Sequence, residues 1–239
     1  MSKKNETIAV ILAGGKGTRL RPYTISLPKP LMPVGDHPIL EIIIKKLRKS
    51  GIKKIVIAVG YLESLIKAYF GDGGRFGVEI IYSREDQPLG TAGPLKLVRK
   101  HLHYSFILIN GDTLTDMDLR EMLKFHKKNR ALATVGVSKR KVDIDFGVLK
   151  VDPGHRLVSY QEKPTIEYFV SMGIYVLEPG VVDYIPKGFF NLPELMIAMK
   201  DAGEKVMAYQ HKGYWLDIGR IEDYQTACGL VEDKGDLFA

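Results

Sequence analysis

The chain has a single cysteine, Cys228, among its 239 residues. This scarcity excludes an internal disulfide and a cysteine-rich zinc site. No apolar run approaches the roughly 18 residues that a membrane-spanning helix requires. The polar start from Met1 to Thr7 does not read as a signal peptide. With one thiol and no export signal, a reducing cytoplasm is the expected compartment, and no membrane partner is expected.

Low-complexity segments, fixed-period repeats and linker-like stretches are also missing. The hydrophobic fraction of 45% and the charged fraction of 26% are typical of a globular protein. A chain of this length fits one large domain or two small ones. Because no shift in composition marks a boundary, we expect a single domain over residues 1–239.

Net charge is unevenly spread along the chain. Residues 1–110 carry +10 and residues 111–239 carry −3, which gives the total of +7. A basic first half could serve nucleic acid, an anionic membrane or small phosphorylated substrates, although most of its lysines are expected to be solvated. The basic run at residues 138–141 has no aromatic neighbours, so nucleic-acid binding is not expected.

Short apolar runs alternate with amphipathic stretches in the first 130 residues. The runs predict buried strands at Ile8–Ala13, Ile55–Val59, Val78–Tyr82 and Phe106–Ile109. The stretches predict helices at Pro38–Ser50, Leu62–Phe70 and Thr91–Leu102, and one that Asp116 or Asp118 caps and that ends near Asn129. This alternation predicts an α/β fold of three layers, Rossmann-like, with a mostly parallel central mixed sheet and helices on both faces.

The pattern changes after residue 130. Strands are predicted at Ala131–Ser138, Phe146–Val151, Arg156–Glu162, Val170–Glu178, Val206–Gln210 and Tyr214–Leu216. Helices are predicted at Pro179–Ile185, Leu192–Ala202 and Ile221–Leu230. The second half is therefore expected to extend the same sheet and to add a strand-rich insert.

A glycine-rich loop follows the first predicted strand. It contains Leu12, Ala13, Gly14, Gly15, Lys16, Gly17, Thr18, Arg19, Leu20, Arg21 and Pro22. It lacks the Gly-Lys-Ser/Thr triplet of a P-loop, and Leu20 stands where a dinucleotide fingerprint needs its third glycine. Backbone amides of such a loop, at the carboxyl end of a parallel strand, bind phosphates. A purely structural turn has no need of three cations, so the loop predicts a phosphate site.

Motifs along most of the chain resemble those of one enzyme family, the sugar-1-phosphate nucleotidyltransferases or nucleotide-sugar pyrophosphorylases. The motifs, in order, are Gly14–Leu20, Leu27–Pro30, Pro88–Gly93, Asn110–Asp112, Phe146–Val148, Glu162–Pro164, Gly173–Val176 and Trp215–Gly219. Within the family, the chain most resembles the mannose- and heptose-1-phosphate guanylyltransferases. The resemblance implies transfer of a nucleotidyl group from a nucleoside triphosphate to a sugar 1-phosphate, with release of pyrophosphate.

The resemblance also implies a role for each matching residue. Its nucleotide-binding residues are Leu12, Ala13, Gly14, Gly15, Gly17, Thr18, Arg19, Gln87, Gly90, Thr91 and Gly111. Its catalytic residues are Arg19, Lys29, Asp112 and Lys163, and its sugar-phosphate residues are Gly147, Glu162, Lys163, Ser171 and Asp217. Asp112 and Asp217 would hold Mg²⁺. Residues 1–130 would then form mainly the nucleotide-binding lobe, and residues 131–239 mainly the sugar-binding lobe.

The chain departs from its relatives in two places. Ser171-Met172 stands where many of them have Asn-Ala. The chain also ends soon after its last predicted helix, so we expect no C-terminal β-helix or CBS domain of the kind that some relatives carry. The base and the sugar stay open, with thymidylyl-, uridylyl- and cytidylyltransferases as alternatives, the last acting on phosphocholine. A catalytically silent paralogue that binds nucleotide-sugar and regulates a partner is a further alternative. A homo-oligomer is compatible with the sequence.

Overall fold

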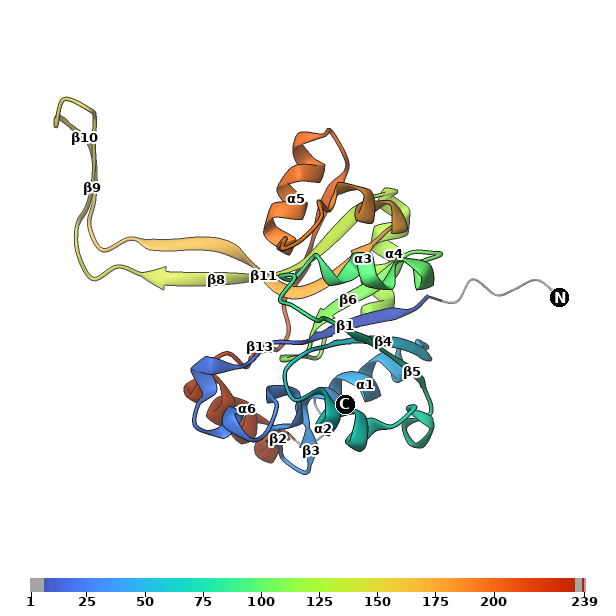
Figure 1. Cartoon of the computed structure of the whole chain (residues 1–239). Coiled ribbons are helices and arrows are strands. Elements are labelled where there is room, and N and C mark those ends of the chain that lie inside the picture. The colour runs from blue at the N-terminus through green and yellow to red at the C-terminus, as the bar shows by residue number, and fades with distance from the viewer. Residues whose placement is uncertain (1–6, 235–237, 239) are drawn as a thin grey trace.

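A seven-stranded sheet forms the centre of the computed structural model, which describes residues 7–234 and residue 238 (Figure 1). Across the sheet, the strands are β12 (Val206–His211), β8 (Ala133–Asp143), β11 (Thr165–Leu177), β6 (Phe106–Asn110), β1 (Ala9–Ala13), β4 (Lys54–Val59) and β5 (Glu79–Arg84). Strand β11 runs antiparallel to both of its neighbours, and the other pairings are parallel. The predicted mostly parallel mixed sheet is confirmed, and strands from both halves of the chain share it.

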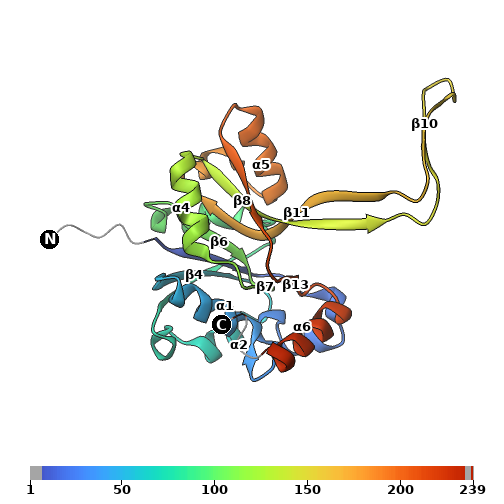
Figure 2. The same cartoon turned by 180° about the vertical axis from the view of Figure 1, so that it is seen from behind.

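Helices cover both faces of this sheet, as Figures 1 and 2 show. The α-helices are α1 (Ile39–Lys49), α2 (Glu63–Phe70), α3 (Pro94–Val98), α4 (Leu119–Asn129), α5 (Leu192–Asp201) and α6 (Ile221–Lys234). One core packs against α1, α2, α4 and α6, and the other against α3 and α5. Alternate residues of β1 point to opposite cores: Ile11 to the first and Val10 to the second.

Three predicted helices differ from those observed. Helix α1 begins at Ile39, because Pro38 belongs to the short strand β3 (His37–Pro38), which pairs with β2 (Pro33–Val34). The stretch Thr91–Leu102 is α-helical only from Pro94, a residue type that suits the first position of a helix, and it ends in the 3₁₀ helix η5 (Arg99–His101). The stretch Pro179–Ile185 forms the 3₁₀ helix η6 (Pro179–Tyr184).

The remaining elements are short. Strand β7 (Thr113–Thr115), which sequence reasoning missed, pairs antiparallel with β13 (Trp215–Asp217). The other 3₁₀ helices are η1 (Thr18–Leu20), η2 (Tyr23–Ile25), η3 (Lys29–Leu31) and η4 (Gly74–Phe76). In the part of the chain that the structure describes, no helix has the length and apolarity of a membrane span.

Strands β8 and β11 are longer than predicted and continue beyond the body of the protein as a two-stranded ribbon (Figures 1 and 2). The ribbon leads into a hairpin of β9 (Val148–Val151) and β10 (Leu157–Gln161). We call residues 139–169 the arm. The arm is the predicted strand-rich insert.

His126 is a fully buried polar side chain at the end of α4. Its Nδ1 lies 2.8 Å from Thr134 Oγ1, and its Nε2 lies 3.1 Å from Glu178 Oε1. Burial lowers the pKa of His126 below its usual 6.5, and Glu178 only partly opposes this effect. The native protein therefore holds a neutral imidazole under conditions in which an unfolded chain protonates it.

We expect the free energy of unfolding to fall as the pH drops below 6.5, by up to about 1.4 kcal/mol per pH unit. The unfolded chain binds a proton there that native His126 does not bind. Urea denaturation between pH 7.5 and 5 measures the effect. His126→Gln should flatten the slope, whereas His103→Gln, at an exposed position, should keep it. Equal slopes in the three proteins would contradict the assignment.

Candidate active site

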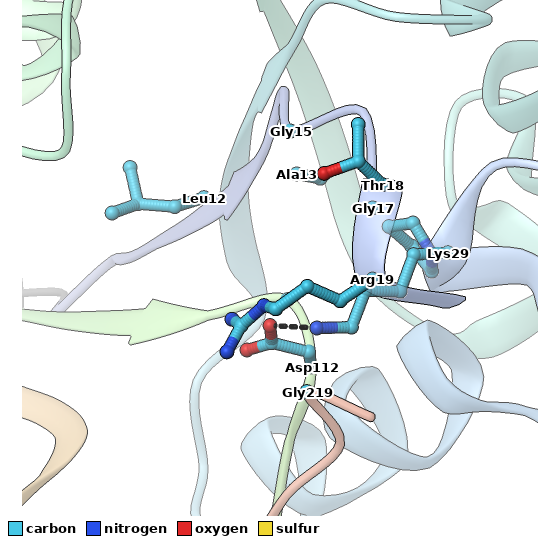
Figure 3. A pocket seen from close by; sticks show the side chains of 11 residues that line it. Leu12, Ala13, Gly15, Gly17, Thr18, Arg19, Lys29, Asp112 and Gly219 are labelled. Atoms are coloured by element: carbon cyan, nitrogen blue, oxygen red, sulfur yellow. Dashed lines mark hydrogen bonds and ion pairs between the residues drawn. The ribbon is translucent and has the colours of Figure 1, made fainter. Parts of the chain in front are cut away.

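A pocket of about 260 Å³ opens at the carboxyl ends of β1 and β6 (Figure 3). Its lining residues are Leu12, Ala13, Gly15, Gly17, Thr18, Arg19, Lys29, Pro30, Gly111, Asp112 and Gly219. Nine of these eleven belong to the predicted nucleotide-binding or catalytic set. Segments far apart in the sequence therefore meet at the sheet edge where α/β proteins bind phosphates.

The glycine loop leaves β1 and turns sharply at Gly17. Its backbone φ of +59° lies in the left-handed region, and a Cβ there would come within 3.0 Å of the Thr24 side chain. Thr24 Oγ1 also donates a 2.8 Å hydrogen bond to the Gly17 carbonyl. The turn leads into η1, which carries Thr18 and Arg19 along one side of the pocket.

Gly111 brings the end of β6 against the end of β1. Its amide donates a 2.9 Å hydrogen bond to the Leu12 carbonyl, and a Cβ on Gly111 would lie only 2.7 Å from that oxygen. Only glycine permits so close an approach. Asp112, the next residue, is thereby held beside the glycine loop.

Asp112 is surrounded by cations. Its Oδ2 accepts a hydrogen bond and ion pair from Lys29 Nζ, and Figure 3 shows the Arg19 side chain reaching toward the same carboxylate. Lys29 lies at the start of η3, directly after Pro28 and before Pro30, so its backbone is restricted. Asp112 Oδ1 is buried and has no hydrogen-bond partner. A buried carboxylate oxygen without a partner is costly, and it marks a position that a cation would satisfy.

Asp217 supplies a second carboxylate from another part of the chain. Thr113 of β7 pairs with Asp217 of β13, and the Ile218 amide donates a 3.0 Å hydrogen bond to the Asp112 carbonyl. Desolvation raises the pKa of Asp217, and the nearby Asp112 carboxylate raises it further, while Lys29 and Arg19 act in the opposite direction. Two carboxylates therefore repel each other at the edge of the pocket.

No group of three or more histidine, cysteine or acidic side chains forms a metal centre among residues 7–234 and 238. The pair of Asp112 and Asp217 nevertheless suits one ion in particular. Mg²⁺ is usually held by one or two protein carboxylates, and phosphates and waters complete its octahedron. The unpartnered Asp112 Oδ1 and the raised pKa of Asp217 fit a cation bound between them.

The predicted base-contacting residues lie outside the pocket lining. Gln87 is exposed, and Gly90, with φ of +79°, packs against the Phe190 carbonyl. Thr91 Oγ1 accepts a 2.8 Å hydrogen bond from the Leu192 amide at the start of α5. These contacts give Gly90 and Thr91 a packing function, and their contact with a base stays a prediction.

The predicted sugar-phosphate residues other than Asp217 lie on or beside the arm. Tyr160 donates a 2.9 Å hydrogen bond to Glu162 Oε2, and a Cβ on Gly147 would collide with the Tyr160 hydroxyl at 2.2 Å. Lys163 follows at the turn between β10 and β11. Ser171 lies in β11, where its Oγ is 3.0 Å from the Tyr175 hydroxyl. The structure brings Gly147 and Glu162 together, but not into the pocket.

Sequence reasoning missed Glu85 as a support of the glycine loop. Glu85 Oε2 accepts a 3.2 Å hydrogen bond from the Leu89 amide, and a Cβ on Gly14 would meet Glu85 Oε1 at 2.8 Å. Burial raises the pKa of Glu85. No motif signalled this contact. Pro30 and Gly219, also absent from the predicted set, lie inside two motifs that carry the family resemblance.

A second hollow, of about 630 Å³, lies between the base of the arm and the segment from β12 to β13. Trp215 lines it and donates a 3.0 Å hydrogen bond from Nε1 to the Met172 carbonyl. The Arg140 guanidinium stacks 5.1 Å from the centre of the Trp215 ring. The hollow is thus aromatic on one wall and basic along its rim.

The fold and the pocket together define a Rossmann-like protein with a pocket, lined by a glycine-rich loop, at the carboxyl edge of its sheet. The sequence match is more specific than the fold. Residues 8–234 match the family model described as Nucleotidyl transferase, and the chain belongs to that family.

Two curated relatives are similar over most of this chain. A UTP–glucose-1-phosphate uridylyltransferase of Synechocystis sp. is 37% identical over 240 residues, which cover 92% of this chain and 62% of that protein. A mannose-1-phosphate guanylyltransferase of Mycobacterium tuberculosis is 36% identical over 224 residues, which cover 90% of this chain and 62% of that protein. The chain therefore spans less than two thirds of the length of either relative.

A solved structure gives the same fold over nearly its whole length. The crystal structure of HddC from Yersinia pseudotuberculosis complexed with GMP-PN superimposes with a TM-score of 0.72 and 27% sequence identity. The match covers 93% of this chain and 98% of that chain.

Lys29→Met should raise the pKa of Asp217 further, because it removes a cation that favours the charged carboxylate. Carbon-13 NMR titration of the side-chain carboxyl groups measures the shift. Lys45→Met is the matched control, since Lys45 pairs with Glu41 at 3.0 Å instead, and it should leave Asp217 unchanged. An unaltered pKa of Asp217 in Lys29→Met would show that Lys29 does not act on this carboxylate.

Proposed function

We propose that this chain is a sugar-1-phosphate nucleotidyltransferase, which joins a nucleoside triphosphate to a sugar 1-phosphate and releases pyrophosphate. One observation carries the proposal: Asp112, with one oxygen paired to Lys29 and the other buried without a partner, lies beside a glycine loop of the kind that binds phosphates. The activities named for the Synechocystis and Mycobacterium relatives are of this class. The single cysteine keeps a reducing cytoplasm as the proposed compartment.

The triphosphate would lie along the glycine loop. Backbone amides near Gly15 and Gly17 would donate to its oxygens, and Arg19 and Lys29 would compensate its charge. Lys29 is well suited to this role because the flanking prolines and the Asp112 ion pair limit its movement. Positioning and charge neutralisation account for most of the catalysis of phosphoryl chemistry, and both come here from the loop and its cations.

The proposed reaction is an in-line displacement at the α-phosphorus. A phosphate oxygen of the sugar 1-phosphate attacks, a new P–O bond forms, and the bond to the bridging oxygen breaks. Pyrophosphate leaves with that electron pair. Arg19 would stabilise the charge that develops at the reacting phosphorus. Glu162 would accept hydrogen bonds from sugar hydroxyls, and Lys163 would pair with the sugar phosphate.

Asp112 and Asp217 would hold one Mg²⁺. The fit rests on the buried oxygen of Asp112, which lacks a partner, and on the mutual repulsion of the two carboxylates. When bound, the ion supplies positive charge at the α-phosphate. The ion pair with Lys29 holds the Asp112 side chain in place beside the glycine loop in this arrangement.

We favour GTP and a manno-configured hexose, heptose or amino-sugar 1-phosphate as the substrates. The Mycobacterium relative is named a mannose-1-phosphate guanylyltransferase, and the HddC structure carries GMP-PN. The hollow beside Trp215 would take the sugar, with the aromatic ring against its apolar face. UTP with glucose 1-phosphate is the second candidate, favoured by the name of the Synechocystis relative.

We expect pyrophosphate release from purified protein supplied with Mg²⁺, GTP and mannose 1-phosphate, at more than ten times the rate with any other base. The measurement uses each nucleoside triphosphate with a panel of sugar 1-phosphates and phosphocholine. Preference for UTP and glucose 1-phosphate would select the second candidate. No release from any pair, with nucleotide-sugar still bound, would reject the enzyme and favour a regulatory binding protein.

Asp112→Asn and Asp217→Asn should each lower kcat by about 100-fold or more, because each variant removes one of the two proposed metal carboxylates. Asp118→Asn is the matched control: Asp118 caps α4, and asparagine caps equally well, so activity should persist. Circular dichroism and cooperative thermal unfolding check that the variants fold. Isothermal titration with Mn²⁺ should show weaker binding in the first two variants only. Near-normal turnover in either would reject the metal assignment.

A further inference from the structure

The hollow beside Trp215 lies close to the two carboxylates proposed to hold a metal. Trp215 and Asp217 are two residues apart in β13, so their side chains share a face and stand about 7 Å apart along the strand. Trp215 Nε1 and Thr113 Oγ1 both donate hydrogen bonds to the Met172 carbonyl, which holds this face of β7 and β13 against β11. Figure 2 shows β13 beneath the point where β8 and β11 leave the body. A sugar whose 1-phosphate lies beside Asp217 can therefore reach the hollow.

Side-chain contacts fix one wall of the hollow. His211 Nε2 lies 2.7 Å from Asp116 Oδ1, and the His211 side chain is only 13% exposed. A Cβ on Gly213 would collide with the same carboxylate, so only glycine lets the chain pass there. Thr115 Oγ1 and the Asp116 amide both donate hydrogen bonds to the Tyr214 carbonyl, at 2.9 Å and 3.2 Å. The segment from β12 to β13 is therefore held in place before a ligand binds, which lowers the cost of binding.

The hollow carries positive charge that its own residues do not balance. Its basic lining residues are Lys139, Arg140, His211 and Lys212, and no acidic residue in the described part of the chain lines it. Lys139 pairs with Glu167 on the arm, and His211 pairs with Asp116. Arg140 and Lys212 have no acidic partner among residues 7–234 and 238. Two positive charges at the hollow are thus left uncompensated.

A neutral sugar alone does not match this lining. Lysine and arginine side chains donate hydrogen bonds and accept none, whereas each sugar hydroxyl both donates and accepts. An ionised carboxylate or phosphate only accepts, and a guanidinium can donate two parallel hydrogen bonds to either group. The Arg140 guanidinium lies 5.1 Å from the centre of the Trp215 ring, and this stacking limits the positions that it can take. The lining therefore favours an anionic group on the ligand.

We propose that the sugar 1-phosphate substrate carries a second anionic group, a carboxylate or a phosphate, which Arg140 and Lys212 bind in the hollow. The 1-phosphate would stay beside Asp217, and the sugar ring would lie next to Trp215 between the two anionic groups. Uronic acid 1-phosphates and hexose 1,6-bisphosphates have this chemistry. The inference rests on the proposed function and narrows its substrate class.

Matched substrates test the preference. Pyrophosphate release is measured with mannose 1-phosphate, mannuronic acid 1-phosphate and mannose 1,6-bisphosphate, and with the corresponding glucose series. We expect kcat/KM for at least one anionic sugar to exceed that of its neutral parent by about ten-fold or more, and Arg140→Gln to lower this ratio by about ten-fold. Arg99→Gln is the matched control: Arg99 is also exposed but pairs with Asp183 at 2.8 Å, so the ratio should persist. Neutral sugars that react as well as the anionic ones, or a ratio that Arg140→Gln leaves intact, would overturn the proposal.

A binding measurement does not depend on activity. Trp215 is the only tryptophan of the chain, so its fluorescence reports on the hollow. Mannose 1,6-bisphosphate should change the emission with a Kd about ten-fold lower than that of mannose 1-phosphate, and added salt should reduce the difference. Arg140→Gln should bring the two Kd values close together, whereas Arg99→Gln should not.

The two measurements separate the inference from the proposed function. If no substrate pair releases pyrophosphate but the bisphosphate still binds more tightly in an Arg140-dependent way, the proposed function fails and the anionic site stands. If turnover is normal but the wild-type protein binds both ligands equally, the proposed function stands and the anionic site is rejected.

Discussion

The parallel pairing of β1 with β6 is the constraint on which the pocket depends. Its register sets Leu12 beside Asn110, so the glycine loop and the segment from Gly111 leave the sheet at one edge. The close contact of Gly111 with the Leu12 carbonyl fixes the direction in which Asp112 leaves the strand. Strand β7 then begins at Thr113 and pairs with β13, which brings Asp217 to the same place. A slip of one residue in β6 would turn Asp112 to the other face and disperse the site.

The charges of the pocket explain only a small part of the basic first half of the chain. Arg19 and Lys29 face the two carboxylates, and the four charges nearly cancel before any phosphate arrives. Other lysines pair on the surface, such as Lys54 with Glu79. Exposed pairs of this kind contribute about 0–1 kcal/mol each. The net charge of a chain does not distinguish a phosphate-binding site from a solvated basic surface. The positions of Arg19 and Lys29 are therefore more informative than the net charge.

The pattern of apolar residues along the sequence predicted those strands and helices that bury at least one full face. Strands β1, β4 and β6 are continuous apolar runs, so both the strands and the glycine loop that follows the first could be found from the residues alone. Strands β2, β3 and β7 have two or three residues each and carry no periodicity to detect. The nearness of Asp217 to Asp112 depends on the pairing of Thr113 with Asp217, 104 positions apart, and only the resemblance to a family pointed to it. Glu85 lies against Gly14 of the loop, where a Cβ would meet its Oε1 at 2.8 Å, and no motif encodes this approach.

The arm and the body are stabilised in different ways. Every central strand of the body pairs on both sides and is covered on both faces, whereas the arm has only two strands and no covering layer. A segment with few buried apolar contacts opens at a lower free energy than the core. Lys163 further lowers the stability of the arm, because its left-handed backbone conformation is strained and no packing surrounds this exposed residue. The arm therefore holds its exposed apolar side chains, together with the predicted Glu162 and Lys163, on a segment that opens more readily than the core.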